Sequence, residues 1–493
     1  MKILFAASEC APFIKTGGLA DIIGALPVEL VKNDVSVSVV MPKYRDIPEV
    51  YKEEMEHLCH FQIHMGWRSQ YCGIETLRQR GVTYYFIDNE YYYARSSVYG
   101  ETDEEGERFA FFCRAVLEML PHTGFPDVLH GNDWQTGMIA PLLRTQYMAD
   151  ERYAAIKTAF TIHNLKYQGV FPWMYIDDLL GLGEKMFTPE NLEFYGAISF
   201  MKGGIVFSDA ITTVSPTYAK EIQTPFYGER MGGLIEQHSA DLIGILNGID
   251  NEEYNPKTDK GIAERFDAKS PEGKEVCKRA LQAELGLEQR DVPVIALITR
   301  MTEQKGLDLI DCVLDDIMRM DVQFVAVGRG EERYQELFSW AAWRYSGRLA
   351  ARIEMNTALV KRVYAGADIL LMPSQFEPCG IVQMIAMRYG TIPVVRETGG
   401  LIDTVEPYNK FEDTGTGFSF ANYNAHEMLF TLEQAVGYYH DEPLWNRLVR
   451  RAMKKDFSFK ASAKAYIRLY RKLTGIKIIQ RRAALPKAAK AEK

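Results

Sequence analysis

Short apolar runs alternate along the chain with stretches whose apolar residues recur at helical spacing. Residues 2–7 and 35–41 are apolar runs, and apolar side chains recur at helical spacing from Leu19 to Leu30. This order predicts a strand, a helix and a second strand, which together form a βαβ unit. Residues 57–88 alternate more weakly, which predicts antiparallel strands or hairpins inserted into the same domain.

The same alternation begins again in the second half of the chain. Apolar runs at 292–299, 322–327, 369–372 and 392–395 are each followed by a loop and a helical stretch. Ahead of them, residues 251–264 are polar and rich in turn-forming residues, which is typical of a domain boundary. We therefore predict an α/β protein with two doubly wound, Rossmann-like domains.

The length of 493 residues is too great for one ordinary hydrophobic core, so the chain is divided as follows. We expect an N-terminal domain at residues 1–248 and a C-terminal domain at residues 249–458. Residues 459–478 are expected to form an amphipathic helix that packs across the junction. Residues 479–493 form a basic tail that we expect to be disordered.

An acidic residue lies where one predicted strand ends. Glu377 follows the apolar run 369–372 and precedes a helical stretch that closes at Gly390. Ligands of open α/β sheets bind at the carboxyl ends of strands, where a carboxylate suits sugar hydroxyls and helix amides suit an anion. The alternative is a helix-capping loop that carries an acidic residue by chance.

The first predicted strand is followed by a basic, glycine-containing loop. Lys15 precedes Gly17 and Gly18, which begin the first helical stretch. Paired glycines let a ligand approach the backbone, and a lysine beside a helix N-terminus suits a phosphate. The dinucleotide fingerprint G-x-G-x-x-G is missing. A glycine turn with a solvent-facing lysine remains the alternative.

Two more predicted strand ends carry polar residues. Asp133 and His163 each follow an apolar run. Taken alone, each is more simply structural, because a histidine after a strand is more often hydrogen-bonded than catalytic. Four strand ends with polar residues, near positions 15, 133, 163 and 377, are nevertheless typical of a ligand site.

Composition excludes several classes of function. A net charge of −9 argues against a nucleic-acid-binding protein. The seven cysteines contain no C-x-x-C pair, which argues against a disulfide framework or zinc site and favours a reducing compartment. No apolar run approaches the roughly 18 residues that a membrane helix needs. We expect a cytoplasmic protein with no membrane or nucleic-acid partner.

Four motifs together resemble the bacterial glycogen synthases and plant starch synthases. They are Lys15-Thr16-Gly17-Gly18-Leu19, residues 300–306, Glu377-Pro378-Cys379-Gly380 and Thr398-Gly399-Gly400-Leu401. The resemblance covers residues 1–475. It implies the GT-B glycosyltransferase fold, in which two Rossmann-like domains face a cleft. It also implies transfer of glucose from ADP-glucose to the non-reducing end of an α-1,4-glucan such as glycogen. Configuration would be retained, and neither a metal nor a cofactor is expected.

The resemblance implies roles for individual residues. Lys15 matches the sugar-nucleotide lysine, and Gly17 and Gly18 would let the donor approach the backbone closely. Arg300 and Lys305 match the pair that neutralises the diphosphate as ADP leaves, which needs fixed positive charge where negative charge develops.

The expected catalytic set consists of Lys15, Arg300 and Lys305 together with two further residues. Glu377 resembles the carboxylate that holds the donor glucose, and His163 resembles the histidine beside the reaction centre. The remaining expected substrate-binding positions are Asp21, Asp133, Asn247, Cys379, Gly380, Thr398, Gly399 and Gly400. A capping or solvent-facing role is the alternative for Asp21.

The sequence departs from related patterns at two places. Many family members have histidines where this chain has Asn132 and Gln135, although Asp133 is kept. Related glycosyltransferases have a second glutamate eight positions after the first, where this chain has Ile385. Double displacement needs a nearby nucleophilic carboxylate, so a front-face displacement is the preferred mechanism.

Three alternatives remain open at this stage. The donor could be UDP-glucose, the chain could be a sucrose-type retaining transferase, or the fold could be an inactive glucan-binding homologue. The presence of Lys15, Arg300, Lys305 and Glu377 together argues against inactivity. Because Lys15 and His163 lie in the first half of the chain and the others in the second, we expect the domains to close around the donor. The oligomeric state is not predicted.

Overall fold

Two α/β units account for the described residues, one built around a mixed sheet and the other around a parallel sheet. The computed structural model describes residues 1–100, 102–354 and 356–476. Unit 1 comprises Met1–Thr161, Tyr167–Ile211 and the described residues from Ala463, and unit 2 comprises Ile162–Lys166 and Thr212–Ser462. The expected tail at 479–493 and the end of the expected last helix, 477–478, lie outside the described residues. The domain boundaries expected from the sequence stay predictions.

The strands and helices of unit 1 alternate as the sequence predicts. Its strands are β1 (Lys2–Ala6), β2 (Ser36–Pro42), β3 (Glu56–Met65), β4 (Arg68–Gln79), β5 (Val82–Asp88), β6 (Val128–Asn132), β7 (Lys157–Ile162), β8 (Val170–Pro172), β9 (Glu193–Phe194), β10 (Ala197–Ser199) and β11 (Ala210–Thr213). Its α-helices are α1 (Gly18–Val31), α2 (Glu49–Lys52), α3 (Glu90–Tyr93), α4 (Glu104–Glu118), α5 (Leu120–Thr123), α6 (Ile139–Leu142), α7 (Glu151–Ala154), α8 (Tyr175–Asp178), α9 (Phe200–Phe207) and α20 (Lys460–Thr474). Shorter turns of other helix types are η1 (Trp134–Thr136), η2 (Leu143–Tyr147) and η3 (Glu184–Met186).

The main sheet of unit 1 runs in the order β11-β7-β6-β1-β2-β5-β4-β3. Strand β1 pairs in parallel with both neighbours, so that Ile3 lies opposite Val37 and Val128. Strands β3, β4 and β5 pair antiparallel, which confirms the hairpins predicted for residues 57–88. All five residues of β6 are buried, as expected for a strand covered on both faces.

The last helix contributes to the core of unit 1. The phenol of Tyr470 lies 2.7 Å from Nδ1 of His130, and the hydroxyl of Thr161 lies 2.6 Å from Nε2 of the same ring. All three side chains are buried. Both ring nitrogens of His130 are therefore used inside the fold, and helix α20 matches the helical stretch predicted near the C-terminus. Whether that helix also packs across the domain junction stays a prediction.

Unit 2 repeats the alternation of strands and helices. Its strands are β12 (Leu242–Gly244), β13 (Val294–Ile298), β14 (Gln323–Val327), β15 (Leu349–Arg352), β16 (Ile369–Met372), β17 (Ile392–Arg396) and β18 (Phe418–Phe420). Its helices are α10 (Pro216–Glu221), α11 (Gly232–Gln237), α12 (Gly273–Leu285), α13 (Leu307–Arg319), α14 (Glu332–Arg344), α15 (Thr357–Gly366), α16 (Val382–Arg388), α17 (Gly399–Thr404), α18 (Ala425–Tyr439) and α19 (Glu442–Lys454), with a short turn η4 (Glu303–Lys305).

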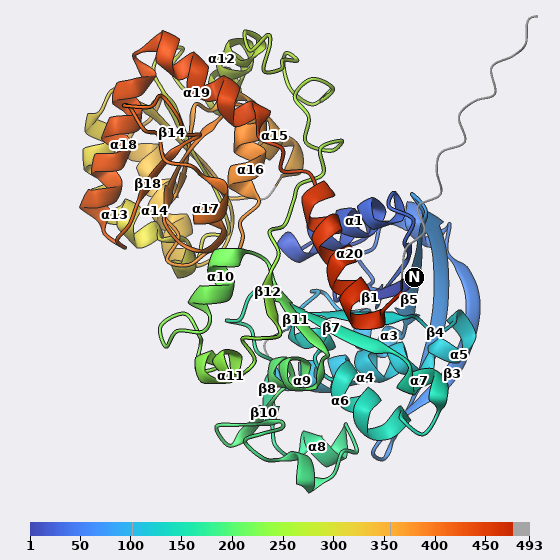
Figure 1. Ribbon diagram of the computed structural model, residues 1–493. Coiled ribbons are helices and arrows are strands. Elements are labelled where there is room, and N and C mark those ends of the chain that lie inside the picture. The colour runs from blue at the N-terminus through green and yellow to red at the C-terminus, as the bar shows by residue number, and fades with distance from the viewer. Residues whose placement is uncertain (101, 355, 477–493) are drawn as a thin grey trace, which may run out of the picture. The chain divides into compact units, whose positions relative to one another are not determined.

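The sheet of unit 2 is parallel throughout and runs in the order β15-β14-β13-β16-β17-β18. This is the strand order of a Rossmann sheet. Strands are added outward from β13 to β15 on one side, and the chain then returns to place β16, β17 and β18 on the other side of β13. Helices α13 and α18 cover one face, and α12, α15 and α16 cover the other (Figure 1). The doubly wound sheet predicted for this half is confirmed, and its switch point lies where β13 and β16 end.

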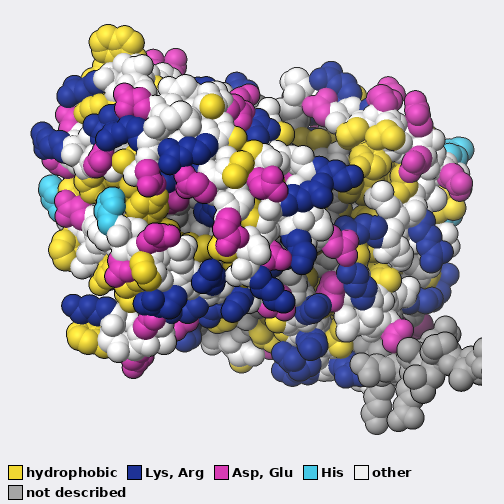
Figure 2. Space-filling model, turned by 90° about the horizontal axis from the view of Figure 1, so that it is seen from above, with side chains coloured by type: hydrophobic (Ala, Val, Ile, Leu, Met, Phe, Trp, Pro, Cys, Tyr) yellow, Lys and Arg dark blue, Asp and Glu magenta, His cyan; other side chains and the backbone are white. Residues whose placement is uncertain are grey.

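Charged side chains of both signs are mixed on the surface seen from above. Figure 2 shows Lys and Arg side chains interspersed with Asp and Glu on this face, with neither sign forming a continuous field. The mixture agrees with the chain's moderate net charge of −9.

A buried ion pair joins α12 to the sheet of unit 2. The ammonium of Lys278 lies 2.9 Å from the carboxylate of Asp368, and their side chains are 1% and 10% exposed. Asp368 also accepts a hydrogen bond from the backbone N–H of Val294, at the start of β13. Burial opposes the charge on Lys278, but the carboxylate outweighs it and raises the pKa of the lysine.

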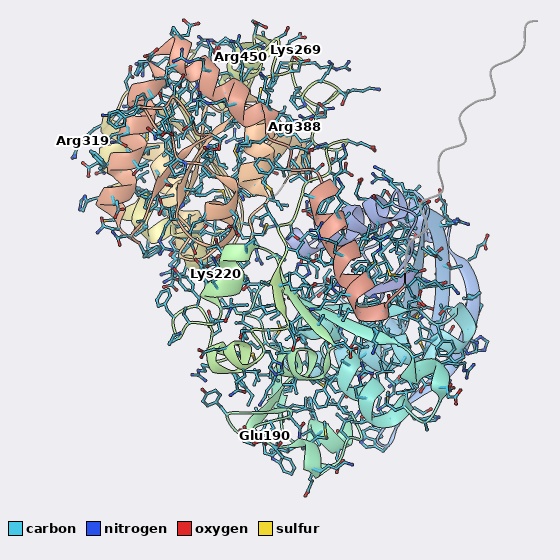
Figure 3. The ribbon with its side chains drawn as sticks, viewed as in Figure 1. Glu190, Lys220, Lys269, Arg319, Arg388 and Arg450 are labelled. Carbon is cyan, nitrogen blue, oxygen red and sulfur yellow. The ribbon has the colours of Figure 1, made fainter. Side chains whose placement is uncertain are left out.

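We expect Lys278→Met to lower the free energy of unfolding by about 3–5 kcal/mol, because it leaves the Asp368 carboxylate buried without its counter-ion. Urea unfolding followed by circular dichroism measures the change. The control is Arg319→Ala (Figure 3), which removes a surface pair with Asp316 and should cost about 1 kcal/mol or less. A loss for Lys278→Met no larger than that of the control would contradict the prediction.

Candidate functional site

Glu377 lies in the loop between β16 and α16, at the carboxyl end of the sheet in unit 2. Its side chain is buried, and its Oε2 accepts hydrogen bonds from the ammonium of Lys305 at 2.6 Å and the hydroxyl of Ser374 at 3.2 Å. Lys305 comes from the connection between β13 and α13, and β13 is the parallel neighbour of β16. The structure therefore brings together two of the five residues expected to be catalytic.

The two loops approach closely because position 306 is a glycine. Gly306 has φ of 69°, and a Cβ there would lie 2.0 Å from the carbonyl oxygen of Pro373. The backbone N–H of Gln375 donates to the carbonyl of Gln304 at 2.8 Å. A side chain at position 306 would push the loops apart and separate Lys305 from Glu377.

The loop after β17 also lies against the Glu377 loop. The N–H of Gly400 donates to the carbonyl of Glu377 at 3.1 Å. A Cβ at Gly399 would lie 2.0 Å from that carbonyl oxygen, and one at Gly400 would lie 2.2 Å from the carbonyl oxygen of Cys379. Gly399, Gly400 and the preceding Thr398 thus lie beside the Glu377 loop, and their role in substrate binding stays a prediction.

Helix α10 holds this pair of loops through contacts that the sequence did not reveal. The hydroxyl of Ser215, just before the helix, donates to the carbonyl of Pro378 at 2.8 Å. Glu221, at the end of the helix, accepts from the hydroxyl of Thr398 at 3.1 Å and the N–H of Gly399 at 2.9 Å. Burial raises the pKa of Glu221, although both hydrogen bonds oppose the rise. No sequence motif marks Ser215 or Glu221 as part of the site.

A second contact joins α10 to α17. Thr217 donates to Asp403 twice, from its backbone N–H at 3.0 Å and from its hydroxyl at 2.8 Å. Both oxygens of Asp403 are therefore used. Arg396, at the end of β17, is another residue that sequence reasoning missed, and it donates to the carbonyl of Gln375 at 2.6 Å.

Cys379 is a neutral thiol beside Asn247. Burial raises the pKa of the Cys379 thiol to about 12, against hydrogen bonds from the backbone and side chain of Asn247. The thiol is 4% exposed and Asn247 is 5% exposed. The next residue, Gly380, has φ of 70°, a left-handed conformation that favours glycine. Asn247, Cys379 and Gly380 therefore form part of the same loop cluster, with the thiol protonated.

His163 lies in the short segment Ile162–Lys166 that packs with unit 2. The N–H of Leu165 donates to the phenol of Tyr218 at 3.1 Å, which joins this segment to α10. Burial lowers the pKa of His163 to about 3. The imidazole is therefore neutral at neutral pH, so it can donate or accept a hydrogen bond but supplies no charge.

Arg300 is exposed at the carboxyl end of β13. Within the described parts of the chain, no hydrogen bond or ion pair engages its guanidinium. The described contacts also do not join Arg300 or His163 to Glu377. The structure therefore places Arg300 on the same connection as Lys305, with its charge available to an anion.

Unit 1 contains the expected glycine loop and an unexpected carboxylate. The ammonium of Lys15 lies 2.7 Å from the carboxylate of Asp21, and both side chains are partly exposed. Glu9, which is buried, accepts from the N–H of Thr16 at 2.6 Å and from the N–H of Gly17. Burial raises the pKa of Glu9 against these hydrogen bonds. Sequence reasoning missed Glu9, which fixes the loop that carries Lys15.

Gly17 and Gly18 have no packing reason to be glycine. A Cβ at Gly17 would make only an ordinary contact, 3.7 Å from the Glu9 carboxylate, and one at Gly18 would meet no heavy atom within 4 Å. Neither residue has a left-handed φ. Open space beside an unconstrained glycine pair is what a ligand approaching the backbone requires.

Asp133 has a strained backbone at the carboxyl end of β6. Its φ is 58° and its ψ is 177°, a region that residues other than glycine rarely adopt. Its carbonyl accepts from the N–H and hydroxyl of Thr136, both at 3.0 Å, and its N–H donates to Thr161 at 3.0 Å. Such strain, held by surrounding hydrogen bonds, is typical of functional sites. No described contact joins Asp133 to Lys15.

The described residues show neither a metal-binding cluster nor a membrane-spanning helix. The described residues contain no group of three or more His, Cys, Asp or Glu side chains placed to hold a metal ion. None of the described helices has the length and hydrophobicity needed to cross a membrane.

Family comparisons agree with the geometry of both units. Residues 2–237 match the family described as the starch synthase catalytic domain, and residues 280–455 match glycosyl transferases group 1. The glycogen synthase of Geobacillus thermodenitrificans is 53% identical over 475 residues, which cover 96% of this chain and 98% of the relative. The glycogen synthase of Bacillus cereus is 51% identical over 96% of this chain and 100% of the relative.

Comparison with solved structures supports the same family assignment. The catalytic domain of starch synthase IV from Arabidopsis thaliana, bound to ADP and acarbose, is 33% identical with a TM-score of 0.90. That comparison covers 96% of this chain and 99% of the plant domain. Sucrose-phosphate synthase from Thermosynechococcus elongatus shares the fold, with a TM-score of 0.62 at 16% identity over 96% of this chain and 99% of the synthase. The resemblance and the GT-B fold expected from the sequence are confirmed, and the chain belongs to the glycogen and starch synthase family of glucan-synthesising glycosyltransferases.

Proposed function

We propose that this protein transfers glucose from ADP-glucose to the non-reducing end of an α-1,4-glucan, retaining configuration and releasing ADP. The observation that carries the proposal is the contact between half-buried Lys305 and buried Glu377, 2.6 Å apart at the switch point of the Rossmann sheet in unit 2. One loop there supplies a cation for the leaving diphosphate, and the other supplies a carboxylate for the donor sugar. ADP bound to the related plant starch synthase supports the same donor class.

Lys305 and Arg300 neutralise the diphosphate as the glycosidic bond breaks. The ammonium of Lys305 has three N–H donors, so it can keep Glu377 while it binds a phosphate oxygen. The guanidinium of Arg300 is exposed, and no described residue engages it. Fixed positive charge at this position stabilises negative charge as it develops on ADP.

Glu377 and His163 hold the donor glucose. Both hydrogen bonds recorded for the Glu377 carboxylate end on Oε2, which leaves Oε1 to accept from a sugar hydroxyl. The neutral imidazole of His163 forms a hydrogen bond with the same glucose. The loop residues Asn247, Cys379, Gly380, Thr398, Gly399 and Gly400 complete the binding surface through their backbones.

The loop of Lys15 contributes to the same reaction from unit 1. The absence of packing at Gly17 and Gly18 supports close approach of the donor to this backbone. Asp21 orients the ammonium of Lys15 through their 2.7 Å contact. The strained backbone of Asp133 supports a further role in substrate binding.

The mechanism is a front-face displacement. Double displacement needs a carboxylate free to attack the sugar. Among the carboxylates near this loop cluster, Glu377 is held by Lys305 and Ser374 in the position that accepts from a sugar hydroxyl, and Asp403 is engaged twice by Thr217. The position eight residues after Glu377 is the buried Ile385. The acceptor hydroxyl then attacks the anomeric carbon on the face from which the diphosphate leaves, and its proton passes to a phosphate oxygen of the departing ADP.

The enzyme works in the cytoplasm. All seven cysteines are free, and five of them are buried. Free cysteines without a disulfide framework are typical of a reducing compartment.

We expect ADP-glucose to be the preferred donor. The measurement is incorporation of labelled glucose into glycogen at a series of concentrations of ADP-glucose and UDP-glucose. The expected result is a higher kcat/KM with ADP-glucose. A higher kcat/KM with UDP-glucose would reject the donor assignment and leave the glucan-synthesising activity intact.

We expect Glu377→Ala to lower kcat by about 100-fold or more, because loss of the carboxylate lets the donor sugar move from its reactive position. The control is Glu397→Ala, which changes an exposed glutamate next to Thr398. Thermal unfolding of both variants separates activity from stability. Full activity in Glu377→Ala, or a loss explained by unfolding at the assay temperature, would remove the role.

We expect catalysis without a divalent metal, because Arg300 and Lys305 already supply positive charge for the diphosphate. Initial rates with excess EDTA should equal those of untreated enzyme. The matched measurement adds magnesium or manganese after EDTA treatment. Activity lost with EDTA and restored by either ion would show that the two basic residues are insufficient.

A further inference from the structure

Arg329 lies directly opposite Arg300 at the carboxyl edge of the sheet in unit 2. Strands β13 and β14 pair in parallel, and each paired residue of β13 lies opposite the residue 29 positions later. An isolated bridge past the strand ends, between Met301 and Gly330, keeps the same register. The N–H of Met301 also donates to the carbonyl of Arg329 at 2.8 Å. The residue opposite Arg300 is therefore a second arginine.

The two arginine side chains carry like charges that nothing in the described chain neutralises. Both are exposed, and among the described residues no hydrogen bond or ion pair engages either guanidinium. Paired strands lie about 4.8 Å apart, and like charges directly opposite each other destabilise a sheet. Two such charges are unexpected in a chain with a net charge of −9. The arrangement indicates a site for an anion, which would remove the repulsion.

The carboxylates on the same two connections have other partners. Glu331 accepts from the N–H of Glu303 at 3.0 Å and from the guanidinium of Arg333 at 3.0 Å. The carboxylate of Glu303 lies 3.6 Å from the same guanidinium. Arg333 therefore pairs with both carboxylates, and the two opposed arginines stay available to a ligand.

The strand order indicates which part of a nucleotide sugar meets Arg329. Strands β14, β13 and β16 are neighbours in one parallel sheet, so the connections that follow them share its carboxyl edge. Glu377 follows β16, and Lys305, which contacts it at 2.6 Å, covers the β16 side of the connection after β13. Arg329 follows β14, on the other side. A donor with its glucose at Glu377 and its diphosphate along β13 thus turns the phosphate nearest the nucleoside toward Arg329.

We propose that Arg329 binds the phosphate attached to the nucleoside of the donor, beside Arg300. The inference rests on the proposed function, since it assumes a nucleoside diphosphate sugar at this edge of the sheet. A guanidinium suits a phosphate because it offers N–H donors in a planar fork. The bound phosphate neutralises both arginines, so two charges that repel each other without a ligand attract the same one.

Arg329 contributes to affinity for the donor and not to the rate of transfer. When the bond between glucose and oxygen breaks, negative charge develops on the phosphate that was attached to glucose. The phosphate attached to the nucleoside keeps its charge, so its contact with Arg329 is equally strong before and during the reaction. An interaction of this kind lowers KM and leaves kcat unchanged. Arg300 and Lys305 differ because they serve the charge that develops.

The test compares Arg329→Ala with Arg329→Lys, which keeps a positive charge, and with Arg450→Ala. Arg450 is exposed on α19 (Figure 3), and within the part of the chain that the structure describes it forms no ion pair, so it is the matched control. Initial rates over a series of ADP-glucose concentrations give kcat and KM. Calorimetry at low and high salt gives the Kd of ADP, and thermal unfolding without nucleotide measures stability.

We expect Arg329→Ala to raise the KM for ADP-glucose and the Kd of ADP by about tenfold each, with kcat unchanged. The Kd of ADP should rise more steeply with salt in the wild type than in this variant, because the variant has lost one contact between charges. Arg329→Lys should keep part of the affinity, and Arg450→Ala should resemble the wild type. Without nucleotide, Arg329→Ala should be at least as stable as the wild type, because it removes a charge that repels Arg300.

Three results would overturn the proposal. The first is an unchanged Kd for ADP in Arg329→Ala. The second is a fall in kcat at unchanged KM, because Arg329 would then act on the phosphate that leaves glucose. The third is a loss of affinity together with a lower Tm than that of Arg450→Ala, which would assign Arg329 a structural role in its loop.

The inference and the proposed function can fail separately. If the wild type preferred UDP-glucose, the same comparison with UDP-glucose and UDP would decide the role of Arg329, because both nucleotides carry the same two phosphates. A wild type that transfers glucose to glycogen from neither donor would reject the proposed function. In that case, calorimetry of ADP with Arg329→Ala and Arg450→Ala still decides whether Arg329 binds the nucleotide.

Discussion

The contact between Lys305 and Glu377 depends on two loops lying closer than ordinary side chains allow. The ammonium and carboxylate are 2.6 Å apart, and Gly306, beside the lysine, leaves no room for a Cβ against Pro373. Each charge is largely buried, so each needs the other to offset its lost hydration. A larger residue at 306 would therefore leave two buried charges unpaired in addition to moving a loop. The ion pair between Lys305 and Glu377 therefore depends on the glycine at position 306.

Glycines also permit a close contact between loops one strand further along the sheet, after β17. Gly399 and Gly400 allow the start of α17 to lie directly against the carbonyls of Glu377 and Cys379. Glu221 then takes the N–H of Gly399, so that amide is already satisfied in the absence of a ligand. A donor that used this amide would have to displace a carboxylate whose pKa is raised by burial. Helix α10 thus supports the site and competes for one of its hydrogen-bond donors.

Sequence patterns identified the strand ends but not their partners. Lys305, Glu377 and the Thr398–Gly400 turn carry recognisable motifs, and parallel strands necessarily bring their carboxyl ends to one edge. Glu9, Ser215, Glu221 and Arg396 carry no such motif, since each acts on a loop that only the fold brings near. Glu221, for example, accepts from a residue 178 positions away. The sequence also did not predict the protonation states of His163 and Cys379. Burial determines both, and burial depends on the whole fold rather than on neighbouring residues in the sequence.

Two other lysines of unit 2 show why the site needs a carboxylate beside its lysine. Lys274 is buried among carbonyl and hydroxyl oxygens, and burial lowers its pKa to about 8. Lys278, one helical turn away, faces the Asp368 carboxylate, and there the pKa is raised. At Lys274, burial lowers the pKa even with the Asp368 carboxylate nearby, whereas at Lys278 direct contact with that carboxylate more than offsets burial. Glu377 compensates the charge of Lys305 when no donor is present, and its second oxygen is free to bind the sugar when one arrives. Using one carboxylate for both purposes keeps a cation ready for the diphosphate without leaving an uncompensated charge in the resting protein.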